Sequence, residues 1–305
     1  MAGTLKLEEK KTQKAPAPGI SLARIMVATD FSTYADRALD YAVSLARRFG
    51  SRVYLTHVIA FAGHDVMEPD LGAPSGETLR KQAERNAKAI EDSGRLFGVP
   101  YEVVIEEGTL WPALGMLLEK HKIDLLVLGT HGLSGPLKAV FGSNAELVMR
   151  NAAVPVLTVG PAVTEEAPFE EEFRTIVFAT DFRPGAEREA ALAYAIAQEH
   201  RSHLLMMHVT PYAPGIPQNE SLLDRELITH QMQELVPGGE RKCLLEFHIA
   251  YGEPESEILR VAEESHADLI VVGATKDGAL SGHLPGTIAY GVVRGAKCPV
   301  LTVKS

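Results

Sequence analysis

The chain has 305 residues, of which 46% are hydrophobic and 23% charged, which is ordinary for a globular protein and long enough for two domains. Its net charge of -10 argues against a general nucleic-acid binder, because phosphate backbones require clustered Lys and Arg. The two cysteines form neither a disulfide framework nor a metal-ligand pattern. The polar start and the lack of a long apolar run lead us to expect a cytoplasmic protein that contacts no membrane.

The first half of the chain alternates between short apolar runs and amphipathic stretches. We expect residues 1–20 to form a mobile tail. The apolar runs that follow cover 25–28, 53–58, 101–105, 125–128 and 154–159. Helical periodicity lies between them, over 34–48, 78–97 and 112–121. Continuous apolar strands that alternate with helices are typical of a parallel sheet covered on both faces.

The second half of the chain repeats the first. RIMVATDFS at 24–32 corresponds to TIVFATDFR at 175–183, an offset of 151, and PVLTV ends both copies. The offset is 144 from Gly108 and Gly252 onwards, so the second copy has lost seven residues (151 − 144). We expect two domains, 21–161 and 173–305, joined by an acidic linker over 162–172. The predicted fold is α/β, with two tandem Rossmann-like five-stranded parallel sheets of order 3-2-1-4-5 and helices on both faces.

A glycine-rich loop follows the fourth predicted strand, in the segment GTHGLSGPLKAVFGSNAE. An open parallel sheet binds ligands beyond the carboxyl ends of its strands, where the winding direction reverses. That crevice would lie between strands 1 and 4, where Asp30 and Gly129 end the two strands. Glycines let the backbone approach a ligand closely, and the amides at the start of the helix after Gly142 favour an anion. The Ser143 hydroxyl is suited to cap that helix or to donate to a phosphate oxygen.

The spacing Gly129-x2-Gly132-x9-Gly142-Ser143, with Asp30 after the first strand, resembles the ATP-binding pattern of the universal stress protein family. The resemblance covers residues 22–305, as a tandem two-domain member. It implies that Asp30 contacts the adenine–ribose side, that Val58 packs near the base and that the loop surrounds the phosphates. Any Mg²⁺ would then come with ATP, since no metal ligand from the protein's side chains is expected. The residues implied for nucleotide binding are Thr29, Asp30, Val58, Gly129, His131, Gly132, Gly142, Ser143 and Asn144.

The second copy departs from this pattern, because Lys276 stands where the middle glycine is expected. A side chain there would either block close approach of the backbone or supply a cation to a phosphate. We expect a weakened second site, although the matching positions persist. Its candidate residues are Asp181, Val209, Gly273, Lys276, Gly286 and Thr287.

Three functions fit the sequence. The favoured one is a regulatory, stress-response protein that binds an adenine nucleotide, ATP. The alternatives are a slow ATPase or phosphotransferase, and an assembly module with vestigial sites. Neither a P-loop nor a G-x-G-x-x-G fingerprint occurs, and no water-positioning residue is evident, so we expect at most slow hydrolysis. The apolar last strands, 154–159 and 298–303, are expected to pair the two domains, and two chains are expected to form a homodimer.

Overall fold

The structure of the chain is a computed structural model, which describes residues 22–60, 75–130, 142–160, 162–163, 172–211, 222–274 and 288–304. The expected tail and most of the expected linker lie outside these residues. The first half contains β1 (Arg24–Ala28), α1 (Thr33–Phe49), β2 (Arg52–Ile59), α2 (Gly76–Asp92), β3 (Tyr101–Glu107), α3 (Leu110–Lys120), β4 (Leu125–Gly129), α4 (Ser143–Asn151) and β5 (Val156–Val159). The second half contains β6 (Thr175–Ala179), α5 (Ala186–His200), β7 (His203–Thr210), α6 (Leu222–Leu235), β8 (Leu244–Tyr251), α7 (Pro254–Glu264), β9 (Leu269–Ala274), α8 (Ile288–Gly295) and β10 (Val300–Lys304).

Local chemistry explains where the helices begin and end. Ser32 caps α1, because its hydroxyl oxygen accepts from the Ala35 amide at 3.2 Å, and Gly50 ends α1 in the left-handed region with φ 66°. The predicted helix over 78–97 was too long, because α2 ends at Asp92. The Ser93 hydroxyl donates to the Ile90 carbonyl at 2.6 Å, and Gly94 then turns the chain with φ 78°. None of the described helices has the length and apolar character that crossing a membrane requires.

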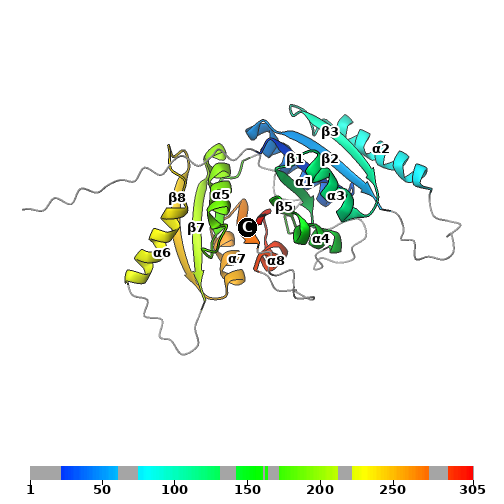
Figure 1. The fold of residues 1–305 in the computed structure, drawn as a ribbon. Coiled ribbons are helices and arrows are strands. Elements are labelled where there is room, and N and C mark those ends of the chain that lie inside the picture. Colours follow the sequence, from blue (N-terminus) through cyan, green and yellow to red (C-terminus); the bar gives the residue numbers. More distant parts are fainter. Residues whose placement is uncertain are drawn as a thin grey trace, which may run out of the picture.

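The strands form one sheet in the order β3-β2-β1-β4-β5-β10-β9-β6-β7-β8 (Figure 1). Each half has the predicted order 3-2-1-4-5 with parallel pairing, and the predicted α/β fold is confirmed. The arrangement differs in one detail from two separate sheets. Strands β5 and β10 pair antiparallel, with Leu157 opposite Leu301, so the ten strands are continuous.

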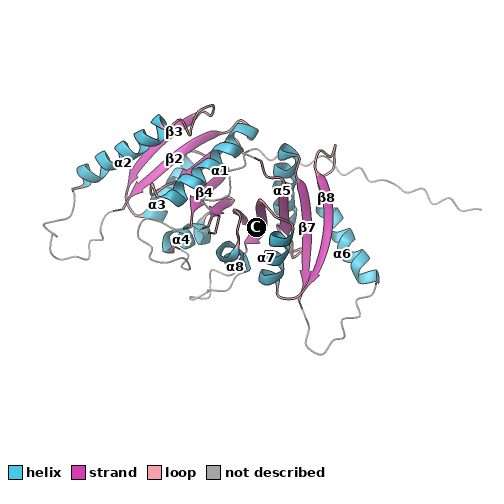
Figure 2. Cartoon of the chain, turned by 180° about the vertical axis from the view of Figure 1, so that it is seen from behind, coloured by secondary structure: helices cyan, strands magenta, loops and turns pink. Residues whose placement is uncertain are grey.

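Helices cover both faces of the sheet, and side chains that alternate along each strand feed two core layers. One layer packs residues such as Val27, Leu157 and Leu301 against α1 and α5. The other packs residues such as Met26 and Val300 against α3, α4, α7 and α8. On this second side, α4 and α8 lie next to each other (Figure 2), and the Tyr290 hydroxyl donates to the Glu146 carbonyl at 3.1 Å. The alternation explains why the central strands, such as β4 and β9, are apolar along most of their length.

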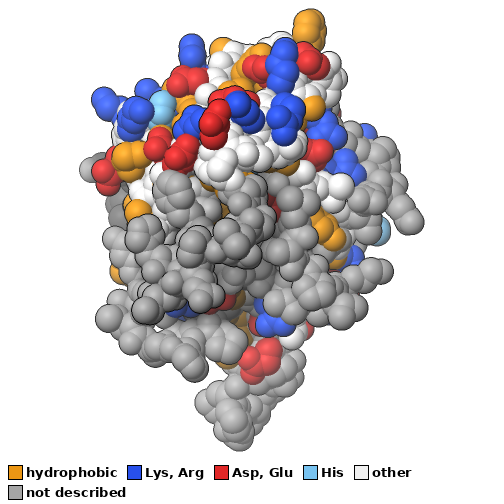
Figure 3. Space-filling view, turned by 90° about the vertical axis from the view of Figure 1, so that its right-hand side faces the viewer, with side chains coloured by type: hydrophobic (Ala, Val, Ile, Leu, Met, Phe, Trp, Pro, Cys, Tyr) orange, Lys and Arg blue, Asp and Glu red, His pale blue; other side chains and the backbone are white. Residues whose placement is uncertain are grey.

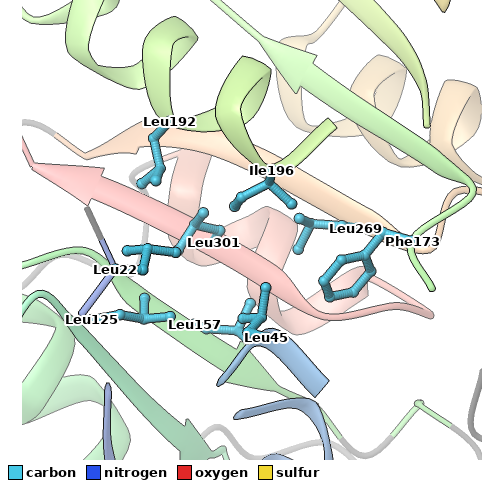
Figure 4. Close-up of a pocket in the computed structure, with 9 residues that line it drawn as sticks. All are labelled: Leu22, Leu45, Leu125, Leu157, Phe173, Leu192, Ile196, Leu269 and Leu301. Carbon is cyan, nitrogen blue, oxygen red and sulfur yellow. The ribbon is translucent and has the colours of Figure 1, made fainter. Parts of the chain in front are cut away.

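Leucines close the join between the two halves. Figure 4 shows Leu157 and Leu301 at its centre, with Leu22, Leu45, Leu192 and Ile196 around them. Leu157 and Leu301 are each 1% exposed. Burial of a leucine side chain contributes roughly 1.5–3 kcal/mol. This apolar join therefore stabilises the ten-stranded sheet across the boundary between the copies.

The segment that enters the second half contacts both halves. The Phe173 ring stacks on Tyr41 of α1, with centroids 6.0 Å apart, and Glu172 forms an ion pair with Arg48. The Phe173 amide donates to Nδ1 of His200 at 3.2 Å, so His200 must be neutral to accept it. Burial, and then the charge of Arg48, lower the pKa of His200 to about 4. Protonation of His200 is therefore expected to oppose docking of this segment.

We predict that His200 makes the protein less stable in mild acid. The pKa in the folded state is below the usual 6.5, so the unfolded chain takes up the proton first. The contribution is present above pH 6.5 and is lost as the pH falls from 6.5 towards 4, by up to about 3 kcal/mol. His200→Gln keeps an acceptor for the Phe173 amide and should flatten the dependence of the free energy of unfolding on pH.

Urea denaturation at several pH values between 4 and 7 measures this effect. The matched control is His230→Gln, because His230 is exposed on α6. That variant should follow the wild-type pH dependence. Equal slopes for wild type and His200→Gln would contradict the prediction.

Candidate functional site

The crevice lies at the carboxyl ends of β1 and β4, which pair in parallel with Ala28 opposite Leu128. The next residues along β1 make a tight turn. Phe31 has φ 62°, its amide donates to the Thr29 hydroxyl oxygen at 2.9 Å, and the Ser32 amide donates to Oδ1 of Asp30 at 3.0 Å. This turn fixes Asp30 between the end of β1 and the start of α1. Thr29 is buried and serves the turn.

The end of β2 supports the same turn. Nδ1 of His57 lies 2.7 Å from the Thr29 carbonyl oxygen, and its ring lies 4.7 Å from that of Phe31. The hydrogen bond gives this strand-end histidine a structural partner. Val58, the next residue, is half-buried and packs against the core layer under α3 and α4. The turn and the end of β2 are thus one rigid unit.

Gly129 ends β4 where the backbone of α1 comes close. A Cβ atom at this position would lie 2.9 Å from the Tyr34 carbonyl carbon and 3.1 Å from the Ala35 nitrogen. Both contacts are with backbone, which cannot move away cheaply. Glycine at this position therefore allows α1 to start directly beside β4.

Gly142 closes the base of the glycine-rich loop. Its amide donates to the Thr130 carbonyl at 2.9 Å, and a Cβ atom there would lie 2.8 Å from the same oxygen. The Thr130 amide in turn donates to the Val159 carbonyl at 3.0 Å, which ties the loop base to β5. The two ends of the loop thus meet beside the crevice.

The first turn of α4 opens next to this loop base. Gly142 is the residue that precedes the helix and it provides no side-chain cap, so Ser143 is the first helical residue and does not cap α4. Ser143 and Asn144 are exposed. The first amides of a helix lack partners within the helix and carry its positive dipole end. This arrangement suits an anion such as a phosphate.

Several predicted site residues fall outside the described part of the chain. They are His131, Gly132, Lys276, Gly286 and Thr287. Their contribution to either crevice remains a prediction.

The second crevice repeats the turn of the first. Phe182 has φ 58°, its amide donates to the Thr180 hydroxyl oxygen at 3.2 Å, and Nδ1 of His208 lies 2.8 Å from the Thr180 carbonyl oxygen. The acidic residue accepts the same backbone bond as Asp30 does, and a guanidinium group also contacts it. The Arg183 amide donates to Oδ1 of Asp181 at 3.1 Å, and its guanidinium lies 3.0 Å from Oδ2. Val209, the counterpart of Val58, is buried.

Two residues at the crevices were missed by the sequence interpretation. Thr130 holds the loop base through its carbonyl and amide groups, which no side-chain pattern reveals. Glu189 of α5 is 5% exposed and lies against Gly273 at the end of β9. Burial, and then the charge of Asp181, raise the pKa of Glu189 to about 7. A comparison of the copies would have flagged it, because the offset of 151 pairs it with Ala38.

The charges that surround the sites do not form a metal cluster or a single-sign surface. No group of three or more His, Cys, Asp or Glu side chains among the described residues is placed to hold a metal ion. The face in Figure 3 mixes Lys and Arg with Asp and Glu over its described part. On α2, for example, Lys81 pairs with Glu77 at 2.7 Å and Lys88 with Asp92 at 2.6 Å.

Comparison with known proteins places the fold and the repeat in one family. The model of the universal stress protein family matches residues 22–160 and again 172–304. A universal stress protein of Methanocaldococcus jannaschii is 31% identical over 143 residues, 45% of this chain and 81% of that protein. One from Mycolicibacterium smegmatis is 22% identical over 294 residues, 92% of this chain and 96% of that protein.

A solved structure shares the fold over both halves. The crystal structure of a universal stress protein from Archaeoglobus fulgidus has a TM-score of 0.69 at 18% identity and covers 93% of this chain and 98% of its own. Since the family model matches most of the chain in two consecutive segments, the chain belongs to the universal stress protein family as a tandem of two such domains.

Proposed function

We propose that this tandem universal stress protein, with domains 21–161 and 173–305 joined by the linker 162–172, is a regulatory protein that binds an adenine nucleotide. ATP would occupy the crevice between β1 and β4, and the second domain would keep a weaker site. The observation that supports this most directly is the first turn of α4, which lacks a side-chain cap beside the closed loop base of Gly142 and Thr130. The first amides of a helix have no partner within the helix itself, and they favour a phosphate at that point.

The remaining residues suit the ribose and the base of the nucleotide. Asp30 is held by the Ser32 amide at the end of β1, where a carboxylate can accept from ribose hydroxyls or a base amine. Val58 offers an apolar contact for the base from the end of β2. In this proposal His131 and Gly132 of the loop complete the phosphate side, and Mg²⁺ arrives bound to ATP. Binding would then bias the conformation or partner choice of a stress-response protein.

Ser143→Asp should separate phosphate binding from helix stability. A carboxylate in the first turn of α4 interacts favourably with the helix dipole, so the fold should be kept. The same charge would repel the phosphates, and we expect ATP affinity to fall by about tenfold or more. Calorimetric titration with ATP and with adenosine measures the change, and adenosine affinity should stay close to that of wild type.

Ser143→Asn is the matched control, because it adds a side chain of the same size without charge. It should bind ATP nearly as wild type does. An unaltered ATP affinity in folded Ser143→Asp would remove α4 from the proposed site.

Turnover of ATP is predicted to be slow. Phosphoryl transfer needs a positioned nucleophile and metal in addition to a phosphate cradle, and the described residues at the crevice include no such arrangement. Phosphate release from saturating ATP with Mg²⁺ should run below about 1 per second. A rate within roughly 1–100 per second would instead support the phosphotransferase or ATPase alternative.

We further propose that the two domains stay paired in solution through β5 and β10, and that two chains form a homodimer. The apolar contact of Leu157 with Leu301 supports the pairing. The double change Leu157→Lys and Leu301→Lys places two charges in that contact, so the domains should separate and the radius of gyration should rise. Leu244→Lys is the control, because Leu244 is 66% exposed on β8.

Small-angle scattering gives the shape, light scattering gives the mass, and circular dichroism checks that the helices remain. A wild-type chain with two separate, extended domains would contradict the pairing, and a monomeric mass would contradict the homodimer.

A further inference from the structure

The two crevices differ at the start of the helix that follows the first strand of each domain. In the first domain α1 begins at Thr33, with Ser32 as its cap. The offset of 151 makes Pro184 the counterpart of Thr33, but α5 begins only at Ala186, after Gly185 with φ 102°. The second domain thus lacks the beginning of this helix.

A carboxyl group fills the space that this shortening leaves. Beside Gly129, the nearest atoms are the carbonyl carbon and Cβ of Tyr34 and the backbone nitrogen of Ala35. Beside Gly273, the corresponding glycine, they are the carboxyl atoms of Glu189, and a Cβ atom there would lie 2.6 Å from Oε2. Glu189 therefore reaches the carboxyl end of β9, at the point where the second crevice opens.

Glu189 is a buried acid at the site of the second domain. It is 5% exposed, and within the described part of the chain no hydrogen-bond donor or cation reaches its carboxyl group. Its counterpart in the first domain is Ala38, which is 0% exposed. Burying an acid costs free energy, and Ala38 at the matching place in the first domain shows that packing here does not require a carboxyl group. Asp181, close enough to influence its titration, adds a second acidic group on the β6 side of the crevice.

We propose that Glu189 is the specificity-determining residue that makes the second crevice bind nucleoside polyphosphates more weakly than the first. The carboxyl group repels phosphates when it is ionised, and its side chain occupies the place beside Gly273 whatever its charge. The inference rests on the proposed function, since it takes the first crevice as the one that accepts ATP. It assigns the difference between the domains to a residue on α5, outside the glycine-rich loop.

The loop offers a competing cause, because Lys276 replaces a glycine there. The test therefore uses full-length chains in which Lys276→Gly is present alone or together with a change at Glu189. Glu189→Ala restores the residue of the first domain, and Glu189→Gln removes the charge while keeping the size. Glu187→Ala is the matched control, because Glu187 is an exposed acid in the same turn of α5.

Equilibrium dialysis with labelled ATP counts the nucleotides bound per chain. We expect a single ATP for wild type, for Lys276→Gly and for Lys276→Gly/Glu187→Ala. Lys276→Gly/Glu189→Ala should bind a second ATP, with affinity at that site improved by about tenfold or more, and Glu189→Gln should give part of the gain. Two outcomes would overturn the proposal: a second ATP in Lys276→Gly alone, or a single ATP in folded variants of Glu189.

The same measurement separates this inference from the proposed function. Suppose that wild type binds no ATP and that Lys276→Gly/Glu189→Ala binds one. The inference about Glu189 would then be supported, and the proposed ATP site of the first domain would be refuted. If Glu189→Ala fails to fold, the Glu189→Gln chain decides the question.

Discussion

The antiparallel contact of β5 with β10 is the interaction on which the rest of the molecule depends. An open parallel sheet leaves the edge of its last strand without backbone partners, and an apolar edge of this kind invites association. Here each domain supplies the partner for the other: Leu157 meets Leu301, and the buried Thr158 and Thr302 hydroxyls donate to carbonyls of the opposite strand. The pairing also brings α1 towards α5 and α4 against α8, so both core layers continue across the boundary.

This constraint leaves the crevices free to diverge. Each lies at its own β1–β4 or β6–β9 strand pair, away from the outer edges β3 and β8 and not within the join itself. The turns that support them are nearly the same, with Phe31 and Phe182 in the left-handed region and His57 and His208 bonded behind them. The two sites differ in the group beside the first glycine. The start of α1 lies beside Gly129, and the Glu189 carboxyl group lies beside Gly273.

Much of the fold could be predicted because it depends on patterns that are local in sequence. Apolar runs marked the strands of the first half, although β3 also carries Glu102, and the repeat supplied the two-domain arrangement. The end of α2 was missed. The apolar residues keep their helical spacing past Gly94, but the backbone leaves the helical conformation after Asp92. The capping role went to Gly142 in place of Ser143, since both residues fit a helix start and only the backbone geometry separates them.

The candidate site was harder to predict, since its parts meet only in the folded chain. Asp30 and Gly129 could be placed from topology, because parallel strands end at a common edge. The hydrogen bond between Gly142 and Thr130 joins residues across the loop; the glycine marks the close approach, but residue type does not name its partner. Glu189 lies on the buried face of α5, whose other residues are mostly apolar. The sequence does not show that this acid lies beside Gly273, and only the structure reveals the contact.

The bond from the Tyr290 hydroxyl to the Glu146 carbonyl has a consequence for how such a protein can evolve. The offset of 144 makes these two residues counterparts, so the contact sits where a dimer of identical chains would present the same side chain from both sides. In such a dimer every substitution appears twice, so these equivalent positions would carry the same residue, and a tyrosine could not face a glutamate there. When both domains belong to one chain, this restriction is removed. The helices α4 and α8 can then carry different residues at equivalent positions.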